Sequence, residues 1–490
     1  MRRIRPAWPL LFAALSGCAL APPFERPVIR TPAAYKASPD GPDGQAPGPA
    51  WTVATPGDAV RRDGWWSVFQ DPALDALLAE LDHASPTLAA ALARYDQARA
   101  VAGLESAGLH PRLTLTGRAE RHQSSQTSAG AQTSTDPEDR FFLGAALGYE
   151  LDLWGRVRNA VEARHADAEA SQADMVNVRL SLQTALADAY FRLRGLDSEL
   201  ALLDQTVTAY RRAQALTQTR HEVGLASGLD AGRAETQLAG AQARRVDVRR
   251  RRAGIENQIA ALVGEVASDF TLPPSNSRPP PPHIPSGVPS ELLQRRPDIA
   301  AAERRMAAAN ARIGVARAAY FPVLNIGAAG GRQTTRGALF SAPAGFWSLG
   351  PLSATIPLWD GGARKAEVAA SRAGHAELSA AYRGTVLEAF REVEDAMTAA
   401  RDLAEQAVQQ HRAADAARRT EALALVLYEE GASDFLDVVT AQTAALESER
   451  AALAVETSRM QAAVALIRAL GGGYAGPETH RSGDLAAETP

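Results

Sequence analysis

The sequence holds few residues whose types and spacing could carry out chemistry. Its nine histidines are scattered, and it has no HExxH motif, no GxSxG motif and no glycine-rich phosphate loop. Cys18 is the only cysteine, which excludes both an intrachain disulfide and a zinc site built on several thiolates. An envelope hydrolase would need a nucleophile and base or a metal constellation, and the sequence offers neither. We therefore expect no enzyme and no cofactor.

The N-terminus has the layout of a secretory signal. Three arginines among the first five residues precede a short apolar run, residues 10–15, which is too short to span a bilayer. The run leads into Leu15-Ser16-Gly17-Cys18, which resembles a bacterial lipobox. In that motif residues 1–17 are removed and the cysteine is acylated. An ordinary signal peptide with an incidental cysteine is the alternative. Ala19 follows, where an aspartate would mark inner-membrane retention, so outer-membrane placement is favoured.

The charge and hydropathy of the remaining chain restrict its partners. The formal net charge is −4, and removal of the leader arginines lowers it by a further three charges. This balance gives no support for nucleic-acid binding. Outside the leader no run of eighteen apolar residues occurs, so any membrane span is expected to consist of β-strands, because backbone groups in lipid need internal partners.

The strongest internal signal is a duplication. Leu151-Asp152-Leu153-Trp154-Gly155 is matched by Ile356-Pro357-Leu358-Trp359-Asp360-Gly361, and the turn at Gly224–Ser227 with Asp230 is matched by Gly431–Ser433 with Asp437. Landmarks in the same order at nearly constant offset indicate two copies. The expected organisation is a signal peptide (1–17), a Pro/Gly-rich tether (18–64), a first repeat (65–271), a Pro-rich linker (272–290), a second repeat (291–472) and a tail (473–490).

Each copy contains a pair of alternating segments that read as strands. Residues 112–120 and 141–153 place apolar side chains on one face and small or polar ones on the other. The second copy repeats the pattern more weakly at 323–328 and 346–358. This alternation is typical of a transmembrane barrel, although a soluble hairpin with one wet face would also show it. Four strands cannot close a barrel, since known barrels start at about eight, so copies of the chain would have to share one.

The helices are expected to be long. Residues 155–222 contain no proline and carry apolar residues at alternating steps of three and four, which is the seam of a coiled coil. About 65 residues at 1.5 Å each make a rod of roughly 100 Å, and 363–429 is its counterpart. The shorter helices expected at 86–109 and 229–263 nearly match one long helix when stacked end to end.

Together these features resemble the TolC-type outer membrane factor family, in its NodT-like efflux lipoprotein branch. The resemblance rests on the lipobox, on Gly64-Trp65-Trp66-Ser67-Val68-Phe69 with Asp71-Pro72, on the duplication, and on Tyr428-x-x-Gly431 leading into Phe435-Leu436-Asp437-Val438-Val439. It covers almost the whole mature chain. It implies a mainly helical, duplicated protomer whose homotrimer forms a twelve-stranded barrel and an α-helical tunnel reaching into the periplasm.

The resemblance also implies a function. The trimer would be the outer-membrane channel of a tripartite efflux system and would passively conduct small toxic compounds or drugs. A periplasmic adaptor and an inner-membrane pump would dock at its closed inner end. Two alternatives remain open, a duct for protein or peptide secretion and a structural coiled-coil lipoprotein between envelope layers.

The resemblance places a periplasmic gate at the two helix-turn-helix tips. Gly224 and Gly431 are the turn glycines that face the adaptor, Asp437 belongs to an acidic ring around the axis, and Leu436 supplies an apolar constriction. Thr440 stands at a second position where relatives carry aspartate, so a single ring is expected.

The same resemblance implies links between neighbouring coils. Tyr428 matches a linking tyrosine with Asp230 as its partner, whereas Ser433 replaces a linking arginine. Helix N-capping is the alternative role of Asp230 and Asp437. Trp154 and Trp359 are interpreted either as anchors at the membrane interface or as packing residues where the strands meet the helices.

Overall fold

The computed structural model describes residues 20–29, 32, 35–36, 64–123, 137–275, 279–282, 284, 292–334 and 345–472. The chain divides into two compact units. The first contains the residues up to Val28 with Arg94–Gln172 and Ala301–Arg383. The second contains Ile29–Ala93, Ala173–Ala300 and the residues from Gly384 onward.

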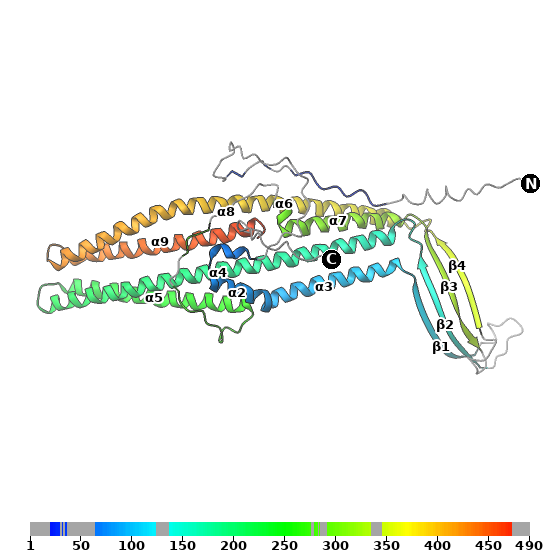
Figure 1. Ribbon diagram of the computed structural model, residues 1–490, viewed down its shortest axis with the longest axis horizontal. Helices are drawn as coiled ribbons and strands as arrows, with labels where there is room; N and C mark the ends of the chain where they lie inside the picture. The colour runs from blue at the N-terminus through cyan, green and yellow to red at the C-terminus, as the bar shows by residue number, and fades with distance from the viewer. Residues whose placement is uncertain are drawn as a thin grey trace, which may run out of the picture. The chain divides into compact units, whose positions relative to one another are not determined.

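The first unit contains one four-stranded antiparallel sheet in the order β1-β2-β3-β4 (Figure 1). Its strands are β1 (Arg112–His122), β2 (Glu138–Glu150), β3 (Val323–Thr334) and β4 (Gly345–Thr355). Each repeat contributes one hairpin, and the pairing of β2 with β3 joins the two hairpins. Within these strand pairings the only irregularity is a register shift between Ile326 and Ala328.

The two faces of the sheet differ as the alternation predicts. The cross-strand register places Leu113, Leu115, Trp347 and Leu349 on one face, where they are 71%, 72%, 83% and 81% exposed. The opposite face carries threonines, glycines and charged residues of the same strands, together with Phe142 and Phe346, which stack on each other. A protein face that leaves so much apolar surface exposed in the single chain is suited to an apolar environment or to a partner.

Several strand bounds differ from the expected ones. β3 continues to Thr334 rather than ending near 328, and its ladder with β2 reaches the pair Phe141–Thr334. Two other strands end earlier than expected. β2 ends at Glu150 rather than at Leu153, because the Asp152 carboxylate accepts hydrogen bonds from the backbone N–H groups of Val157 and Arg158 and so starts the next helix. β4 ends at Thr355 rather than at 358, two residues before a proline that has no N–H to donate.

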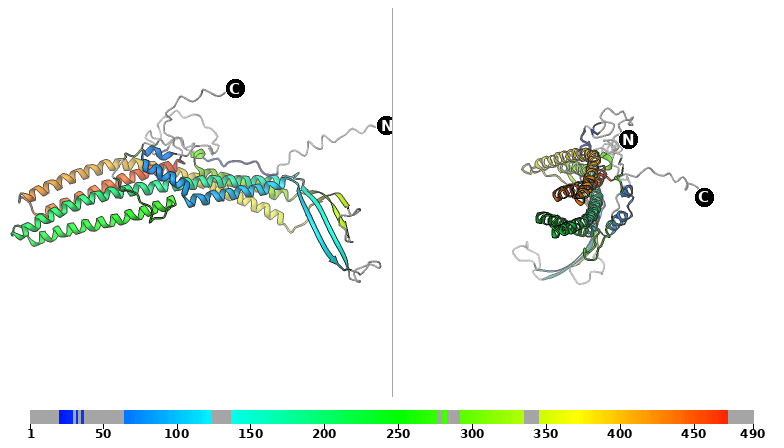
Figure 2. Two further views of the ribbon diagram at one scale, coloured as in Figure 1. Left: turned by 60° about the horizontal axis from the view of Figure 1, so that its bottom comes forward. Right: turned by 90° about the vertical axis from the view of Figure 1, so that its left-hand side faces the viewer.

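The helices follow the expected ranges. The first repeat has α3 (Pro86–Ser106) with η2 (Ala107–Leu109), α4 (Arg156–Glu222) and α5 (Gly228–Val263), and the second has α6 (Leu292–Arg295), α7 (Pro297–Ala318), α8 (Ala363–Glu429) and α9 (Phe435–Ala469). Helices α4 and α8 have 67 residues each, which gives roughly 100 Å at 1.5 Å per residue. In the second unit α4 runs antiparallel beside α5 and α8 beside α9 (Figures 1 and 2). Among the described residues no helix has both the length and the hydropathy to cross a membrane.

The shorter helices meet end to end, as their lengths predict. Gly264 ends α5 with φ +82°, and a Cβ there would lie 2.3 Å from the carbonyl oxygen of Ala84, next to the start of α3. In the second repeat Gly471, with φ +86°, lies against the carbonyl of Arg295 beside the start of α7. Only glycine fits such a left-handed, closely approached position, so both composite rods depend on it.

Two elements before α3 were not expected as helices. They are η1 (Trp65–Phe69) and α2 (Pro72–Ala84). Asp71 accepts hydrogen bonds from the backbone N–H groups of Ala73 and Leu74 and one of 2.6 Å from the Tyr190 hydroxyl. Burial raises the pKa of Tyr190 to about 12, and its hydrogen bond to the Asp71 carboxylate acts in the same direction. The motif 64–72 is thereby fixed to α4 in the main core of the second unit.

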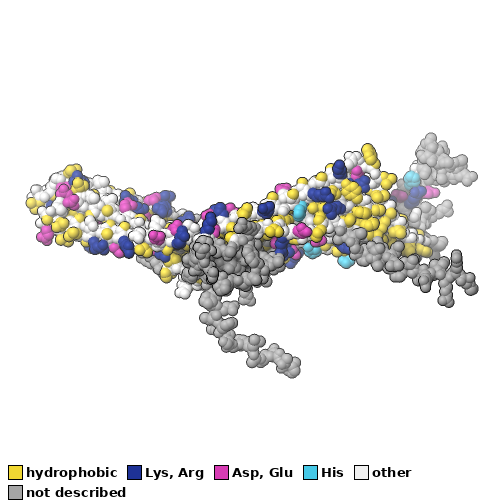
Figure 3. Space-filling model, turned by 90° about the horizontal axis from the view of Figure 1, so that it is seen from above, with side chains coloured by type: hydrophobic (Ala, Val, Ile, Leu, Met, Phe, Trp, Pro, Cys, Tyr) yellow, Lys and Arg dark blue, Asp and Glu magenta, His cyan; other side chains and the backbone are white. Residues whose placement is uncertain are grey.

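Charged side chains of both signs are interspersed on the face shown in Figure 3. No extended patch of one sign stands out there. This distribution fits a solvated helical surface rather than a nucleic-acid interface.

Candidate functional site: the two helical tips

The first tip joins α4 to α5 through a glycine turn. Gly224 has φ +79°, and the N–H groups of Leu225 and Ala226 donate to the carbonyl of Arg220 at 2.7 and 3.2 Å. A residue in this left-handed conformation is the common way to end an α-helix, and glycine adopts it without strain. Gly224 has open space around it, so the turn is set by backbone conformation rather than by crowding.

Asp230 starts α5 as one half of a capping box. The Ser227 hydroxyl accepts from the Asp230 N–H at 3.2 Å, and the Asp230 carboxylate accepts from the Ser227 N–H at 3.3 Å and from its hydroxyl at 2.7 Å. Arg233 adds an ion pair of 3.3 Å. The capping role that the sequence left open for Asp230 is therefore present in the structure.

The second tip has the same glycine turn, but a different residue caps the helix that follows. Gly431 has φ +76°, and Ala432 N–H donates to the carbonyl of Leu427 at 2.8 Å. Here Asp434 caps α9 by accepting from the N–H of Asp437 at 3.2 Å. The carboxylate of Asp437 is exposed and makes no hydrogen bond or ion pair within the part of the chain that the structure describes. Asp437, unlike Asp230, is thus available for a role outside its own helix.

Tyr428 lies in a small apolar cluster between the two hairpins. Its side chain is 6% exposed, and its ring centroid is 5.2 Å from that of Phe435. Within the chain its hydroxyl faces the Thr217 hydroxyl at 3.4 Å, and not Asp230, the predicted partner. The predicted link from Tyr428 to Asp230 between neighbouring coils remains a prediction.

Arg220 is a tip residue that the sequence reasoning missed. Its guanidinium donates two hydrogen bonds of 2.7 Å to the carbonyls of Tyr428 and Glu429 at the C-terminal end of α8, and it lies 4.7 Å from the centroid of the Tyr428 ring. These carbonyls have no partner inside the helix, and the helix dipole makes them a favourable site for a cation. An arginine in the last turn of α4 was the available signal, but its target lies 208 residues away.

The other predicted tip residues differ in exposure. Leu436 is 45% exposed, and the Thr440 hydroxyl donates to the Leu436 carbonyl at 2.8 Å, which is a local bond within α9. Ser433 makes no link between the hairpins among the described residues, and its buried hydroxyl has no partner there. At the tip of the second repeat Asp434, Leu436 and Asp437 are exposed, and of the two aspartates Asp434 is engaged as the helix cap.

The two tryptophans at the strand ends differ. Trp154 stacks on Phe321 at 4.7 Å and donates to the carbonyl of Pro322 at 2.9 Å, which is packing at the start of β3. Trp359 is 89% exposed and stays available for an interface. The proposed lipidation site, Cys18, lies outside the described residues.

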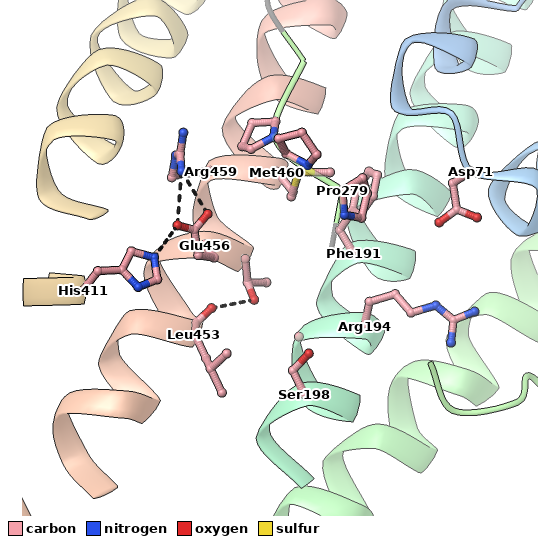
Figure 4. A pocket seen from close by; sticks show the side chains of 14 residues that line it. Asp71, Phe191, Arg194, Ser198, Pro279, His411, Leu453, Glu456, Arg459 and Met460 are labelled. Carbon is pink, nitrogen blue, oxygen red and sulfur yellow. Dashed lines mark hydrogen bonds and ion pairs between the residues drawn. The ribbon is translucent and has the colours of Figure 1, made fainter. Parts of the chain in front are cut away.

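A cavity of about 410 Å³ in the second unit shows no catalytic arrangement (Figure 4). Among its lining residues Glu456 lies 2.8 Å from the His411 ring nitrogen and accepts from Arg459 at 3.0 Å, so the guanidinium of Arg459 offsets the carboxylate charge. No cluster of three metal-ligating side chains occurs in the described ranges.

The duplicated helical hairpins and four-stranded sheet define a channel protomer of the TolC-like class. The outer membrane efflux protein family matches residues 77–265 and 288–472, and the chain belongs to this family. It is an outer-membrane channel of an efflux pump and not an enzyme.

Individual relatives agree with this assignment. The chain is 31% identical over 486 residues to the antibiotic efflux pump outer membrane protein ArpC of Pseudomonas putida, covering 97% of both chains. It is 32% identical over 425 residues to the pyoverdine export outer membrane protein OpmQ of Pseudomonas aeruginosa, covering 84% of this chain and 87% of the relative. The solved structure of the outer-membrane channel OprN superposes with a TM-score of 0.83 at 30% identity, covering 93% of this chain and 99% of that one.

Proposed function

We propose that three copies of this chain form one duct for the export of small molecules. Each copy would contribute four strands to a shared twelve-stranded barrel and its long helices to a tunnel in the periplasm. The sheet carries this proposal, because its edge strands β1 and β4 have no partner within the described chain and its apolar face is exposed. Unpaired strand edges are costly in lipid, and pairing β4 of one copy with β1 of the next removes them.

Native mass spectrometry of the detergent-solubilised protein tests the assembly. A complex of three times the mature chain mass is expected. A stable, folded monomer that still forms channels in planar bilayers would overturn the shared barrel.

We further propose that the exported compounds are small drugs, solvents or siderophores. The names of the relatives ArpC and OpmQ support this range. A strain lacking the gene should accumulate a fluorescent antibiotic in the cell, and the restored gene should reverse this. Unchanged drug accumulation together with loss of secreted proteins would favour a protein-secretion duct instead.

The closed end of the duct is assigned to the two tips. In a trimer, three copies of Asp437 and Leu436 would surround the axis, because both side chains are exposed and Asp437 has no partner among the described residues of its own chain. The turns at Gly224 and Gly431 would contact a periplasmic adaptor, which connects the duct to an inner-membrane pump.

The N-terminal cysteine is proposed as a second attachment to the outer membrane. Residues 15–18 resemble a lipobox, and the lipid contributes about 0.8 kcal/mol for each buried CH₂ group. Mass spectrometry of the N-terminal peptide should show acylated Cys18. The Cys18→Ala protein should stay in the membrane fraction if the sheet is the spanning element, whereas release into the soluble fraction would show that lipid alone holds it.

A further inference from the structure

Residues 20–26 lie along α7 and are held there by three side chains. Arg317 donates to the carbonyl of Leu20 at 3.0 Å, and Asn310 donates to the carbonyl of Pro22 at 2.8 Å. Glu303 accepts from Arg26 at 2.6 Å. The three helix residues are spaced seven apart, which is about two turns, so they share one face of α7. We call Glu303, Asn310 and Arg317 the ladder.

The lengths of the two segments fix the register of this contact. Fourteen helical residues from Glu303 to Arg317 rise about 21 Å at 1.5 Å each. Six residues from Leu20 to Arg26 reach about 20–22 Å when fully extended. The two spans match, so the three contacts are made together when the segment runs extended along α7. The ion pair of Arg26 with Glu303 is specific to one register, because it needs the side chain of residue 26.

The face of α7 is shaped for this segment. With the segment in place Asn310 and Glu303 are only 7% and 5% exposed, so the segment covers these polar groups and also supplies their hydrogen-bond partners. A Cβ on Gly314 would lie 2.6 Å from the Asn159 side chain and 2.9 Å from the Cβ of Ala21, so glycine lets both Asn159 and the segment approach α7. These contacts make the segment part of the first unit.

We propose that the ladder clamps residues 20–26 in one register and thereby fixes the position of residue 18. Residue 18 carries the lipid under the proposed function, on which this inference partly rests. Two peptide units allow Cys18 no more than about 7 Å from Leu20. The backbone carbonyl of Leu20 accepts a hydrogen bond from Arg317, which lies six residues before the start of β3. The lipid would therefore enter the membrane beside the sheet.

A free tether would act differently. Residues 18–64 as a flexible chain would have a root-mean-square span of about 40 Å, several times the distance that the clamp allows. The clamp thus keeps the two proposed membrane attachments of the protomer, the lipid on Cys18 and the sheet, close together. Glu303, Asn310 and Arg317 are the positioning residues of the clamp.

The clamp itself is tested by limited proteolysis of the full-length protein in lipid nanodiscs. Arg26→Glu and Asn310→Ala should each raise the rate of proteinase K cleavage within residues 20–26 at least tenfold. Residues 23–25 are already exposed, but a protease must draw its substrate into the active site, and the hydrogen bonds to α7 resist this. Arg26→Glu combined with Glu303→Arg should restore resistance to within about threefold. Wild-type cleavage rates in both single variants would overturn the clamp, and the Asn310 variant decides the matter if the reversed pair does not fold.

The predicted position of the lipid is tested by lengthening the chain between residue 18 and the clamped segment. Ten Gly/Ser residues inserted between Ala19 and Leu20 should reduce the protease-protected fraction of the sheet in outer-membrane vesicles at least threefold. The same insertion between Gly44 and Gln45 is the matched control and should change it by less than a fifth. Equal effects of the two insertions would overturn the positioning role.

Mass spectrometry of the same samples separates the two proposals. An unmodified Cys18 in the wild type would overturn the lipid anchor of the proposed function. The cleavage rates of the ladder variants still decide the clamp, since they do not depend on acylation.

Discussion

The guanidinium of Arg220 lies 4.7 Å from the ring centroid of Tyr428 and donates to its backbone carbonyl at 2.7 Å. Arg220 belongs to the first repeat and Tyr428 to the second, so this one side chain ties the two hairpins together at their tips. It satisfies carbonyls that no residue of α8 can reach.

Removal of this arginine should loosen the tip. Arg220→Ala is expected to cost about 1–2 kcal/mol, because charge-assisted hydrogen bonds and a cation–π contact are lost at a partly exposed site. The measurement is single-channel conductance in planar bilayers, which should rise. Arg212→Ala on the exposed surface of α4 is the matched control and should conduct like the wild type. Equal conductance of both variants and the wild type would rule out a role of Arg220 in closure.

The two tip aspartates should respond differently to substitution. Asp230→Ala removes half of a capping box and should lower stability by about 0.5–2 kcal/mol. Asp437→Ala leaves the cap at Asp434 intact, so its stability should stay within about 0.5 kcal/mol of the wild type. If Asp437 belongs to the gate, its removal should still raise conductance. Thermal unfolding and conductance measured on the same preparations separate the two roles, and a destabilised Asp437→Ala channel of unchanged conductance would contradict the assignment.

Helices α4 and α9 approach each other closely at a glycine. A Cβ on Gly195 would lie 2.3 Å from the Thr457 Oγ and 3.0 Å from its Cγ2. Gly195→Ala should therefore destabilise the protein by about 1–3 kcal/mol, as overpacking in a core does. Thr457→Ala in the same chain should recover part of this loss in thermal unfolding. Gly240→Ala on α5, where nothing lies within 4 Å, is the control and should stabilise by about 0.5–1 kcal/mol.

Glu421 should make stability depend on pH. Burial raises the pKa of its carboxyl, and the neighbouring Glu449 carboxylate raises the pKa further. A folded pKa above the ordinary value of 4.5 means that the stabilising contribution is complete below that pH. It is lost as pH rises through the folded pKa.

Replacement by glutamine removes this dependence. Glu421→Gln should raise the unfolding temperature at pH 7, and the difference from the wild type should vanish near pH 4. Asp415→Asn is the control, since this exposed carboxylate already pairs with Arg418 at 3.0 Å. A constant difference between Glu421→Gln and the wild type across this pH range would show that the effect is not due to ionisation.

Local patterns in the sequence determined the elements of this protein. The absence of proline and the three-and-four spacing of apolar residues predicted α4, and the duplication predicted α8 as its counterpart, each to within a residue at either end. Alternation predicted the strands and the apolar face of the sheet, clearly in the first repeat and more weakly in the second, where β3 is longer than expected. These features depend on neighbours along the chain, so periodicity reveals them. The strand ends were less predictable, because Asp152 serves the following helix rather than the strand.

Only the tertiary structure decided which side chains meet. Ser227 and Asp434 occupy equivalent caps, but the structure shows that the Asp230 carboxylate is engaged there, whereas the Asp437 carboxylate makes no bond to the residues that the structure describes. The contact of Arg220 with α8 joins residues 208 positions apart, and the ladder on α7 joins residues 277–297 positions apart. No periodic pattern encodes such contacts, because they follow from how helices pack and which backbone groups are left without partners. The sequence alone determined the class of protein and the place of its tips, and the three-dimensional packing decided how those tips and the N-terminal segment are held.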